Sequence, residues 1–254
     1  NKLLILNLGV DSENTSLAFT QKWINEISLN FDSVDVLTMK VGKNYQLNKN
    51  VNLHFINDQN TNYTKIYQLK KLTKVTRKLI ENNNYTHCFA HMAPMQHLIA
   101  KFYLVRKNIK TTLWFTHSGP AFGIKWLILW FSSMLANNIV TASKSSFPFR
   151  FKKVKCIGHG INYEIFFEER TTFQLKNISI LSRVSKSKNI DNTLDNIIKC
   201  KNFENMNIDV IGGTLNIEDE NYLNELLIKY KNFKNINFLG KQPHSKLPEL
   251  LKKY

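Results

Sequence analysis

The chain has 254 residues, 43% of them hydrophobic and 12% aromatic, with a formal net charge of +16. This composition supplies enough apolar surface for two packed domains, and it excludes a fibrous protein or a largely disordered chain. The positive excess is concentrated in residues 1–165, which carry 21 Lys and Arg against 8 Asp and Glu. A nucleic acid, an anionic membrane or an anionic substrate would each match that charge.

The sequence predicts neither a secretory signal nor a membrane-spanning helix. The longest apolar stretch, residues 122–135, is interrupted by Lys125 and is shorter than the ~20 apolar residues that cross a bilayer. The three cysteines lack CxxC spacing, which favours a reducing compartment, and we expect each of them to be buried. These features predict a cytoplasmic protein, peripheral at most on the inner face of the membrane.

Residues 1–165 alternate short strand-like runs with helical patterns, which is typical of a parallel sheet covered by helices. In chain order, the patterns predict strand 3–8, helix 16–27, strands 34–37 and 53–56, helix 65–80, strand 87–90, helix 95–105, strand 111–115, helix 123–135, and strands 139–142 and 153–157. We therefore expect a first Rossmann-like domain over residues 1–165.

A second alternating unit begins near residue 166 and has fewer elements. Its patterns predict strands 178–181, 208–211 and 236–239, and helices 189–199, 219–230 and 247–254. Three strands are fewer than the five or six of a doubly wound sheet, so residues 166–254 are expected to be a partial domain. We expect one face of this sheet to be uncovered and apolar, and the chain to be a fragment.

Basic residues and glycines follow the strands of this second unit. Arg183, Lys186 and Lys188 lie between a strand end and a helix start, where free backbone N–H groups and the helix dipole favour an anion. Gly212-Gly213 and Gly240 end the next two strands, and paired glycines let a ligand approach the backbone closely. Taken singly, the cations also fit a solvated loop and the glycines an ordinary turn.

In this order and spacing, the motifs resemble those of family-4 glycosyltransferases, which have the GT-B fold. The resemblance lies in Gly160-Ile161-Asn162 to Phe166, Ser182-Arg183, Lys188-Asn189, Gly212-Gly213, Phe238-Leu239-Gly240, Thr116-His117-Ser118 and Thr141-Ala142-Ser143. The chain departs from that pattern at its first loop, which lacks the glycines, at His159 and Asn162, and in having no counterpart of the family's Glu-x7-Glu segment.

The resemblance implies two Rossmann-like domains, the second incomplete, and transfer of a sugar from a nucleotide-diphosphate sugar with retention at the anomeric carbon. It implies His117, Arg183 and Lys188 as catalytic residues. It implies a donor site made of Arg183, Lys188, Gly212, Gly213, Gly240 and Lys241. The first domain would hold a glycan or lipid-linked acceptor. Because the donor glutamates have no counterpart, we expect the 254 residues alone to be inactive.

No metal or other cofactor is expected. The sequence has no Asp-x-Asp triplet, no phosphate-binding GxxxxGK[ST] loop and no GxGxxG. Two alternatives stay open: a basic nucleic-acid-binding α/β protein, although no such signature is found, and a non-catalytic GT-B relative. Five cations on one face of the helix 65–80 predict a contact with an anionic membrane: Lys70, Lys71, Lys74, Arg77 and Lys78. A solvated helix face is the other reading of those cations.

Overall fold

The computed structural model describes residues 1–12, 17–58, 61, 63–117, 119, 122–160, 166 and 176–254. It divides into two compact units, Asn1–Ile161 and Asn162–Tyr254. Each unit is described by itself. No helix in the described part of the chain is long and apolar enough to cross a membrane.

The first unit is built around one parallel sheet of seven strands in the order β3-β2-β1-β4-β5-β6-β7. Its strands are β1 (Lys2–Val10), β2 (Ser33–Val41), β3 (Val51–Asn57), β4 (His87–His91), β5 (Lys110–Trp114), β6 (Asn138–Thr141) and β7 (Val154–Cys156). Its helices are α1 (Thr20–Ser28), α2 (Lys65–Asn82), α3 (Pro94–Leu104) and α4 (Ile124–Leu135). The predicted parallel sheet with helices is therefore confirmed.

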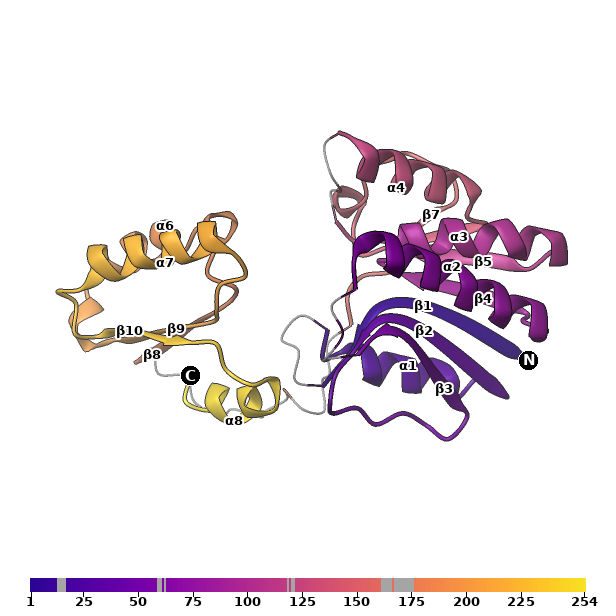
Figure 1. Ribbon diagram of the computed structural model, residues 1–254. Coiled ribbons are helices and arrows are strands. Elements are labelled where there is room, and N and C mark those ends of the chain that lie inside the picture. The colour runs from indigo at the N-terminus through magenta and orange to yellow at the C-terminus, as the bar shows by residue number, and fades with distance from the viewer. Residues whose placement is uncertain are drawn as a thin grey trace. The chain divides into compact units, whose positions relative to one another are not determined.

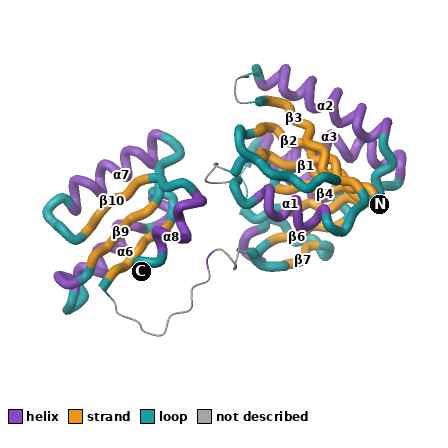
Figure 2. Tube along the Cα trace, turned by 90° about the horizontal axis from the view of Figure 1, so that it is seen from below, coloured by secondary structure: helices purple, strands orange, loops and turns teal. Residues whose placement is uncertain are grey.

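The helices cover both faces of this sheet because the strand residues alternate between two cores. Leu4 and Leu6 pack with residues of α2, α3 and α4, whereas Leu3 and Ile5 pack with Ile24 of α1. Figure 1 shows α2, α3 and α4 on one side of the sheet and α1 on the other, and Figure 2 shows the same sheet from below. The strand order reverses between β1 and β4, and a ligand crevice forms at the carboxyl ends of strands where that happens.

A buried carboxylate stabilises the opposite, amino-terminal end of the sheet. Asp35, near the start of β2, accepts hydrogen bonds from Tyr85 and Asn52 and forms ion pairs with Lys2 and His54. Burial alone would raise the pKa of Asp35, but the bonds from His54, Tyr85, Lys2 and Asn52 outweigh it and lower the pKa. Because this network lies far along the strands from the crevice, we assign it to stability.

The second unit is a parallel sheet in the order β10-β9-β8. Its elements are β8 (Asn177–Leu181), α6 (Ile190–Ile198), β9 (Asn207–Ile211), α7 (Ile217–Tyr230), β10 (Ile236–Gly240) and α8 (Leu247–Leu251). Helices α6 and α7 lie on one face, over a core that includes Ile208, Val210, Leu194 and Leu226 (Figure 1).

The expectation of an apolar open face on this second sheet is wrong over most of its length. The strand positions that alternate with the core residues are polar near the amino-terminal ends: Asn177, Ser179, Asn207, Asp209 and Asn237. Asn237 donates to Asp209 at 2.9 Å, and Tyr254 also donates to Asp209. That contact holds residue 254 near the sheet. Helix α8 ends at Leu251, three residues before the predicted end of the helix at residue 254.

One expectation about the cysteines is also wrong. Cys88 is buried in β4 as expected, but Cys156 and Cys200 are exposed. Cys156 ends β7, which is the edge strand of its sheet, and Cys200 follows the last turn of α6. Both positions lack a covering element among the described residues, so burial of a small apolar side chain is not available there.

Candidate functional site

The predicted donor-binding residues of the second unit converge at the carboxyl ends of its three strands. Ser182 and Arg183 follow β8, Gly212 and Gly213 follow β9, and Gly240 ends β10. Backbone hydrogen bonds join the three strand ends: Gly212 N donates to Gly240 O at 2.9 Å, and Val184 N donates to Gly213 O at 3.0 Å. The carboxyl ends of parallel strands are where α/β proteins bind ligands.

The glycines of this cluster are required by the close packing of its backbone. A Cβ on Gly212 would lie 1.7 Å from the carbonyl oxygen of Ser182, and a Cβ on Gly213 would lie 2.9 Å from Lys241 Cβ. Gly240 has a φ of +66°, a backbone conformation that side chains disfavour. The paired glycines are therefore more than an ordinary turn, because they let the β8 and β10 loops close over the end of β9.

Arg183 is the cation that the structure orients most clearly in this cluster. Its Nε lies 3.7 Å from Asp219 Oδ2, and its side chain is 43% exposed, which leaves room for an anion on the guanidinium. Asp219 is buried in the first turn of α7, where it also accepts a hydrogen bond from Leu215 N at 3.1 Å. The carboxylate therefore holds both Arg183 and the loop that follows β9.

Lys186 and Lys188 lie in a single 3-10 turn, Lys186–Lys188, and both are exposed. Residues two apart in a 3-10 helix lie about 240° apart around its axis, so the two ammonium groups do not share a face. The residue before the turn, Ser185, is buried, and its carbonyl accepts a hydrogen bond from Lys188 N at 2.9 Å. Lys188 as the cation that faces the ligand stays a prediction.

The amino terminus of α6 contributes less to this site than the sequence suggested. Asp191 N donates to Tyr222 Oη at 3.1 Å, and Tyr222 Oη in turn donates to Asp191 Oδ1 at 2.7 Å. One N–H group is thus already used, and a carboxylate occupies the first turn, where it offsets the helix dipole. Side chains of the loop, rather than the helix end, carry most of the positive potential.

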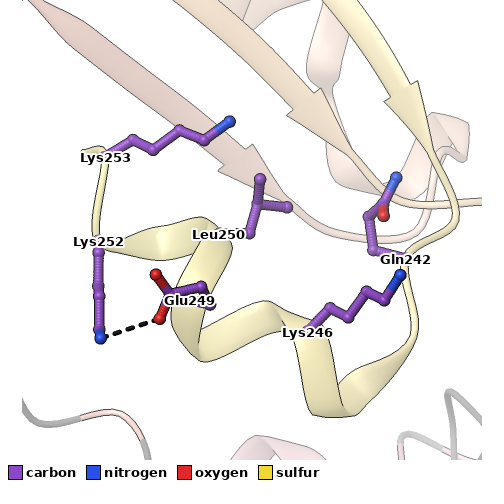
Figure 3. Close-up of a pocket in the computed structure, with 6 residues that line it drawn as sticks. All are labelled: Gln242, Lys246, Glu249, Leu250, Lys252 and Lys253. Atoms are coloured by element: carbon purple, nitrogen blue, oxygen red, sulfur yellow. Dashed lines mark ion pairs between the residues drawn. The ribbon is translucent and has the colours of Figure 1, made fainter.

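Figure 3 shows a cavity of about 630 Å³ in this unit, along α8. It is lined by Gln242, Lys246, Glu249, Leu250, Lys252 and Lys253. None of the predicted donor-binding residues lines it, although Gln242 directly follows Lys241 in the chain. An ion pair between Lys252 and Glu249 at 2.9 Å lies at its rim, and we place the candidate site at the strand ends instead.

The first unit holds a second cluster, at its crevice, that was not predicted from the sequence. Asn7 of β1, His91 of β4 and Trp114 of β5 lie in one row across neighbouring strands, on the face that α1 covers. Trp23 of α1 packs against His91 with ring centroids 5.0 Å apart, and Trp114 lies 5.8 Å from His91. The cluster lies where the strand order reverses, which is the part of a Rossmann-like sheet that binds ligands.

Unpaired polar atoms are concentrated in this second cluster. Four buried side-chain atoms there have no hydrogen-bond partner among the described residues: Asn7 Nδ2, Trp23 Nε1, His91 Nδ1 and Trp114 Nε1. A fifth, Oε1 of Gln96, belongs to α3, and the Nε2 of the same side chain donates to Asn7 O at 3.0 Å. Burial, helped by the nearby His159, lowers the pKa of His91 to about 4, so its imidazole is neutral at pH 7. Unpaired buried polar groups are costly, so this concentration distinguishes the cluster from an ordinary apolar core at the end of the sheet where the crevice forms.

His117 lies three residues beyond the end of β5, at the same end of the sheet as this crevice cluster. It is exposed, and its ring contacts Phe115 with centroids 6.3 Å apart. Gly160 and the Phe166 motif are only partly visible, because residues 161–165 lie outside the described part of the chain. Three or more potential metal ligands do not group anywhere among the described residues.

Aromatic packing was the signal that could have revealed the crevice cluster from the sequence. His91 directly follows the predicted strand 87–90, and Trp114 is the second-last residue of the predicted strand 111–115; such positions point to the ligand edge of the sheet. Aromatic residues at strand ends are also common in packed interiors, so the pattern alone does not distinguish a ligand edge from a core.

No family model matches the sequence, and no curated protein matches it. Solved structures do match. Anabaena Alr3699/HepE in complex with UDP is 14% identical with a TM-score of 0.67, over 99% of this chain and 71% of that chain. A glycosyltransferase from Rickettsia africae is 14% identical with a TM-score of 0.64, over 98% and 70%. UDP-GlcNAc 2-epimerase from Methanocaldococcus jannaschii is 12% identical with a TM-score of 0.59, over 99% and 76%.

At these identities the likeness establishes the fold and leaves the activity to be argued from the site. The same arrangement of parallel sheets is found in glycosyltransferases and in UDP-sugar epimerases. The chain therefore has the α/β architecture of the GT-B fold, built from Rossmann-like units.

Proposed function

We propose that the chain binds a nucleotide-diphosphate sugar in its second unit and belongs to an enzyme that transfers the sugar to an acceptor. The observation that carries this proposal is the closure of three strand ends around Gly212, beside the exposed guanidinium of Arg183. A site of this kind brings backbone that carries no side chain close to a cation, which suits a diphosphate. The UDP-bound neighbours with this fold support the choice of ligand.

The proposed chemistry needs fixed positive charge. Breaking the anomeric bond builds negative charge on the departing diphosphate, and fixed cations stabilise such a charge without a metal. Arg183 grips two phosphate oxygens, and Lys188 follows the leaving group as a compact charge. We propose that transfer is metal-independent and retains the anomeric configuration, which the proton coupling constant of the product's anomeric centre tests.

The crevice cluster of the first unit suits the acceptor side of this reaction. A sugar presents many hydroxyl groups, each able to donate and accept a hydrogen bond, and the cluster places polar side chains and aromatic rings at the carboxyl ends of β1, β4 and β5. His117 is proposed to lie beside the transferred sugar and to bond one of its hydroxyl groups. A glycan or lipid-linked acceptor is proposed.

Calorimetric titration of the 254-residue chain with UDP tests the donor site. Each charged contact to a phosphate contributes about 1.5–3 kcal/mol, so Arg183→Ala and Lys188→Ala should each weaken binding about tenfold or more. Lys186→Ala is the matched control, because its ammonium group does not share a face with that of Lys188, and it should bind like the parent. Binding that is unchanged in Arg183→Ala would remove the diphosphate from these strand ends.

Epimerisation of a UDP-sugar is the second candidate activity, because an epimerase is among the structural neighbours. Enzymes of both kinds bind a UDP-sugar, so UDP binding does not distinguish a transferase from an epimerase. Incubation with UDP-GlcNAc and no acceptor does: an epimerase converts it to its C2 epimer, whereas a transferase leaves the configuration at C2 unchanged. Appearance of the epimer would replace the transfer proposal and keep the donor site.

A further inference from the structure

Helix α4 has an inverted pattern, with large apolar side chains outside and serines inside. Its outward residues Ile124, Leu127 and Phe131 are exposed by 71%, 43% and 44%, and Phe122 just before the helix is exposed by 89%. Spacings of three and four residues place 124, 127 and 131 on one stripe, which Met134 and Leu135 extend.

The buried side of the same helix is satisfied by hydrogen bonds instead of apolar packing alone. Ser132 is bonded to His97 Nδ1 at 2.8 Å, and Ser133 donates to the carbonyl of Leu129 at 2.6 Å. The first bond fastens α4 to His97 of α3, whose other ring nitrogen is bonded to Thr111 of β5 at 3.0 Å. The inner side of α4 is therefore fixed within the unit, and its outer stripe is a surface of the folded unit. An exposed apolar stripe of this size is typical of an interaction surface.

The charge around α4 distinguishes between possible partners. From residue 82 to residue 163 the sequence has no Asp or Glu. The same stretch carries ten cations: Lys101, Arg106, Lys107, Lys110, Lys125, Lys144, Arg150, Lys152, Lys153 and Lys155. A second copy of this chain would bring one such cationic rim against another, which opposes a symmetric dimer, whereas an anionic lipid surface attracts it.

The dimensions of α4 suit a helix that lies on a bilayer. Twelve residues give a length of roughly 18 Å, well short of the ~30 Å hydrocarbon core. An apolar stripe with Trp126 and Trp130 on the helix and cations around it is the pattern of an interfacial helix. Trp126 is fixed by an edge-to-face contact with Phe149, so the basic segment 144–155 lies beside the helix.

The cationic face of α2 is a weaker candidate for this contact than the sequence suggested. Arg77 pairs with Glu81 at 2.8 Å, and Lys71 donates to the carbonyl of Ile56 and lies over the ring of Tyr63. Two of its five cations are therefore occupied within the fold.

We propose that the outer face of α4, formed by Phe122, Ile124, Leu127, Phe131, Met134 and Leu135, inserts into the surface of an anionic lipid bilayer. Lys101, Lys107 and Lys153 are hydrogen-bonded within the fold, so the cations that hold the first unit against the headgroups are Lys125, Lys144, Arg150, Lys152 and Lys155. The inference does not depend on sugar transfer, because lipid binding is measured without substrate.

Co-sedimentation of the 254-residue chain with vesicles tests this. Vesicles of phosphatidylcholine with one third phosphatidylglycerol should pellet the chain at least tenfold better than phosphatidylcholine alone. The double variant Ile124→Asn/Phe131→Asn should lose that binding at least tenfold. The matched control is Leu29→Asn/Ile228→Asn, and it should bind like the parent. These side chains are 73% and 70% exposed, Leu29 directly after α1 and Ile228 on α7.

A third variant, Lys70→Glu/Lys74→Glu/Lys78→Glu, separates α4 from the basic face of α2. Undiminished binding by the α4 variant overturns the proposal, and so does loss of binding in the α2 variant alone. Light scattering at increasing protein concentration tests the other possible partner of this face, a second copy of the chain. Self-association of the parent that the α4 variant abolishes, without any vesicle binding, would show that a second copy covers this face.

Discussion

Gly212 has less tolerance for a side chain than any other glycine whose surroundings the structure describes. A methyl group there would meet the backbone carbonyl of Ser182, which cannot move away without breaking the closure of the three strand ends. We therefore expect Gly212→Ala to destabilise the second unit by about 3 kcal/mol or more.

Hydrogen exchange of amides in the second unit, measured at increasing urea concentration, gives this loss of stability. Gly160→Ala is the control, since nothing lies within 4 Å of the Cβ it would gain, and its stability should equal that of the parent. Equal stability of Gly212→Ala and the parent would mean that the loops of β8 and β9 do not pack as described.

His97 makes the stability of the first unit depend on pH. Its two ring nitrogens are bonded to Ser132 and Thr111, and burial, with smaller effects of Lys101 and Lys153, lowers its pKa from 6.5 to about 4. Between those values the unfolded chain binds a proton that the folded chain does not, so stability falls as the pH falls from 6.5 towards 4. The slope is about 1.4 kcal/mol per pH unit for this one histidine.

Urea denaturation at pH 7 and pH 5 tests this, with His97→Gln as the comparison. The variant is expected to be less stable at pH 7 and to lose less stability on acidification than the parent. If both proteins lose the same amount between pH 7 and pH 5, the buried neutral imidazole is not the cause.

At the scale of an element, α6 and α7 are fastened to each other by Tyr222. Its hydroxyl group bonds both the N–H and the carboxylate of Asp191 in the first turn of α6. Tyr222→Phe removes both bonds and leaves the ring in the core, so we expect a loss of about 1–3 kcal/mol in the stability of the second unit. UDP affinity should stay unchanged, because Asp191 and Tyr222 lie outside the proposed donor site.

Thermal unfolding and calorimetry on the same samples check both parts of this prediction. Tighter UDP binding by Tyr222→Phe would show that the first turn of α6, freed from the tyrosine, does contribute to the anion site after all.

Most elements could be predicted from the sequence because hydrophobic periodicity determines them locally. The strands and helices around Leu4, Ile24, Leu72 and Val210 are found where their apolar spacing places them, with ends that differ by a few residues. The positions of Arg183, Gly212 and Gly240 could be predicted as well, because each lies within two residues of a strand end, whereas their role in donor binding stays a prediction. Both kinds of prediction rest on neighbours in the sequence.

Features that depend on contacts between distant segments could not be predicted. The row of Asn7, His91 and Trp114 arises from the strand order, which places β4 between β1 and β5. The polar open face of the second sheet depends on which alternate residues α6 and α7 cover. The same limit applies to α4, because the apolar spacing predicts a helix there but not which of its side chains the packing leaves exposed.

At the scale of the whole molecule, each unit contains its own core and its own ligand edge. The cores that include Leu4 and Leu3 lie entirely in the first unit, and the core that includes Ile208 lies entirely in the second. Under the proposed function the donor site lies in the second unit and the acceptor side in the first, so we expect UDP to perturb one unit only.

Amide chemical shifts on addition of UDP test the donor site most directly. In a 15N-labelled 254-residue chain, the account predicts shifts at Ser182, Arg183, Gly212, Gly213 and Gly240, while Asn7, His91 and Trp114 keep their positions. Shifts confined to the crevice of the first unit, or no shift at millimolar UDP, would contradict the placement of the diphosphate at the carboxyl ends of β8, β9 and β10.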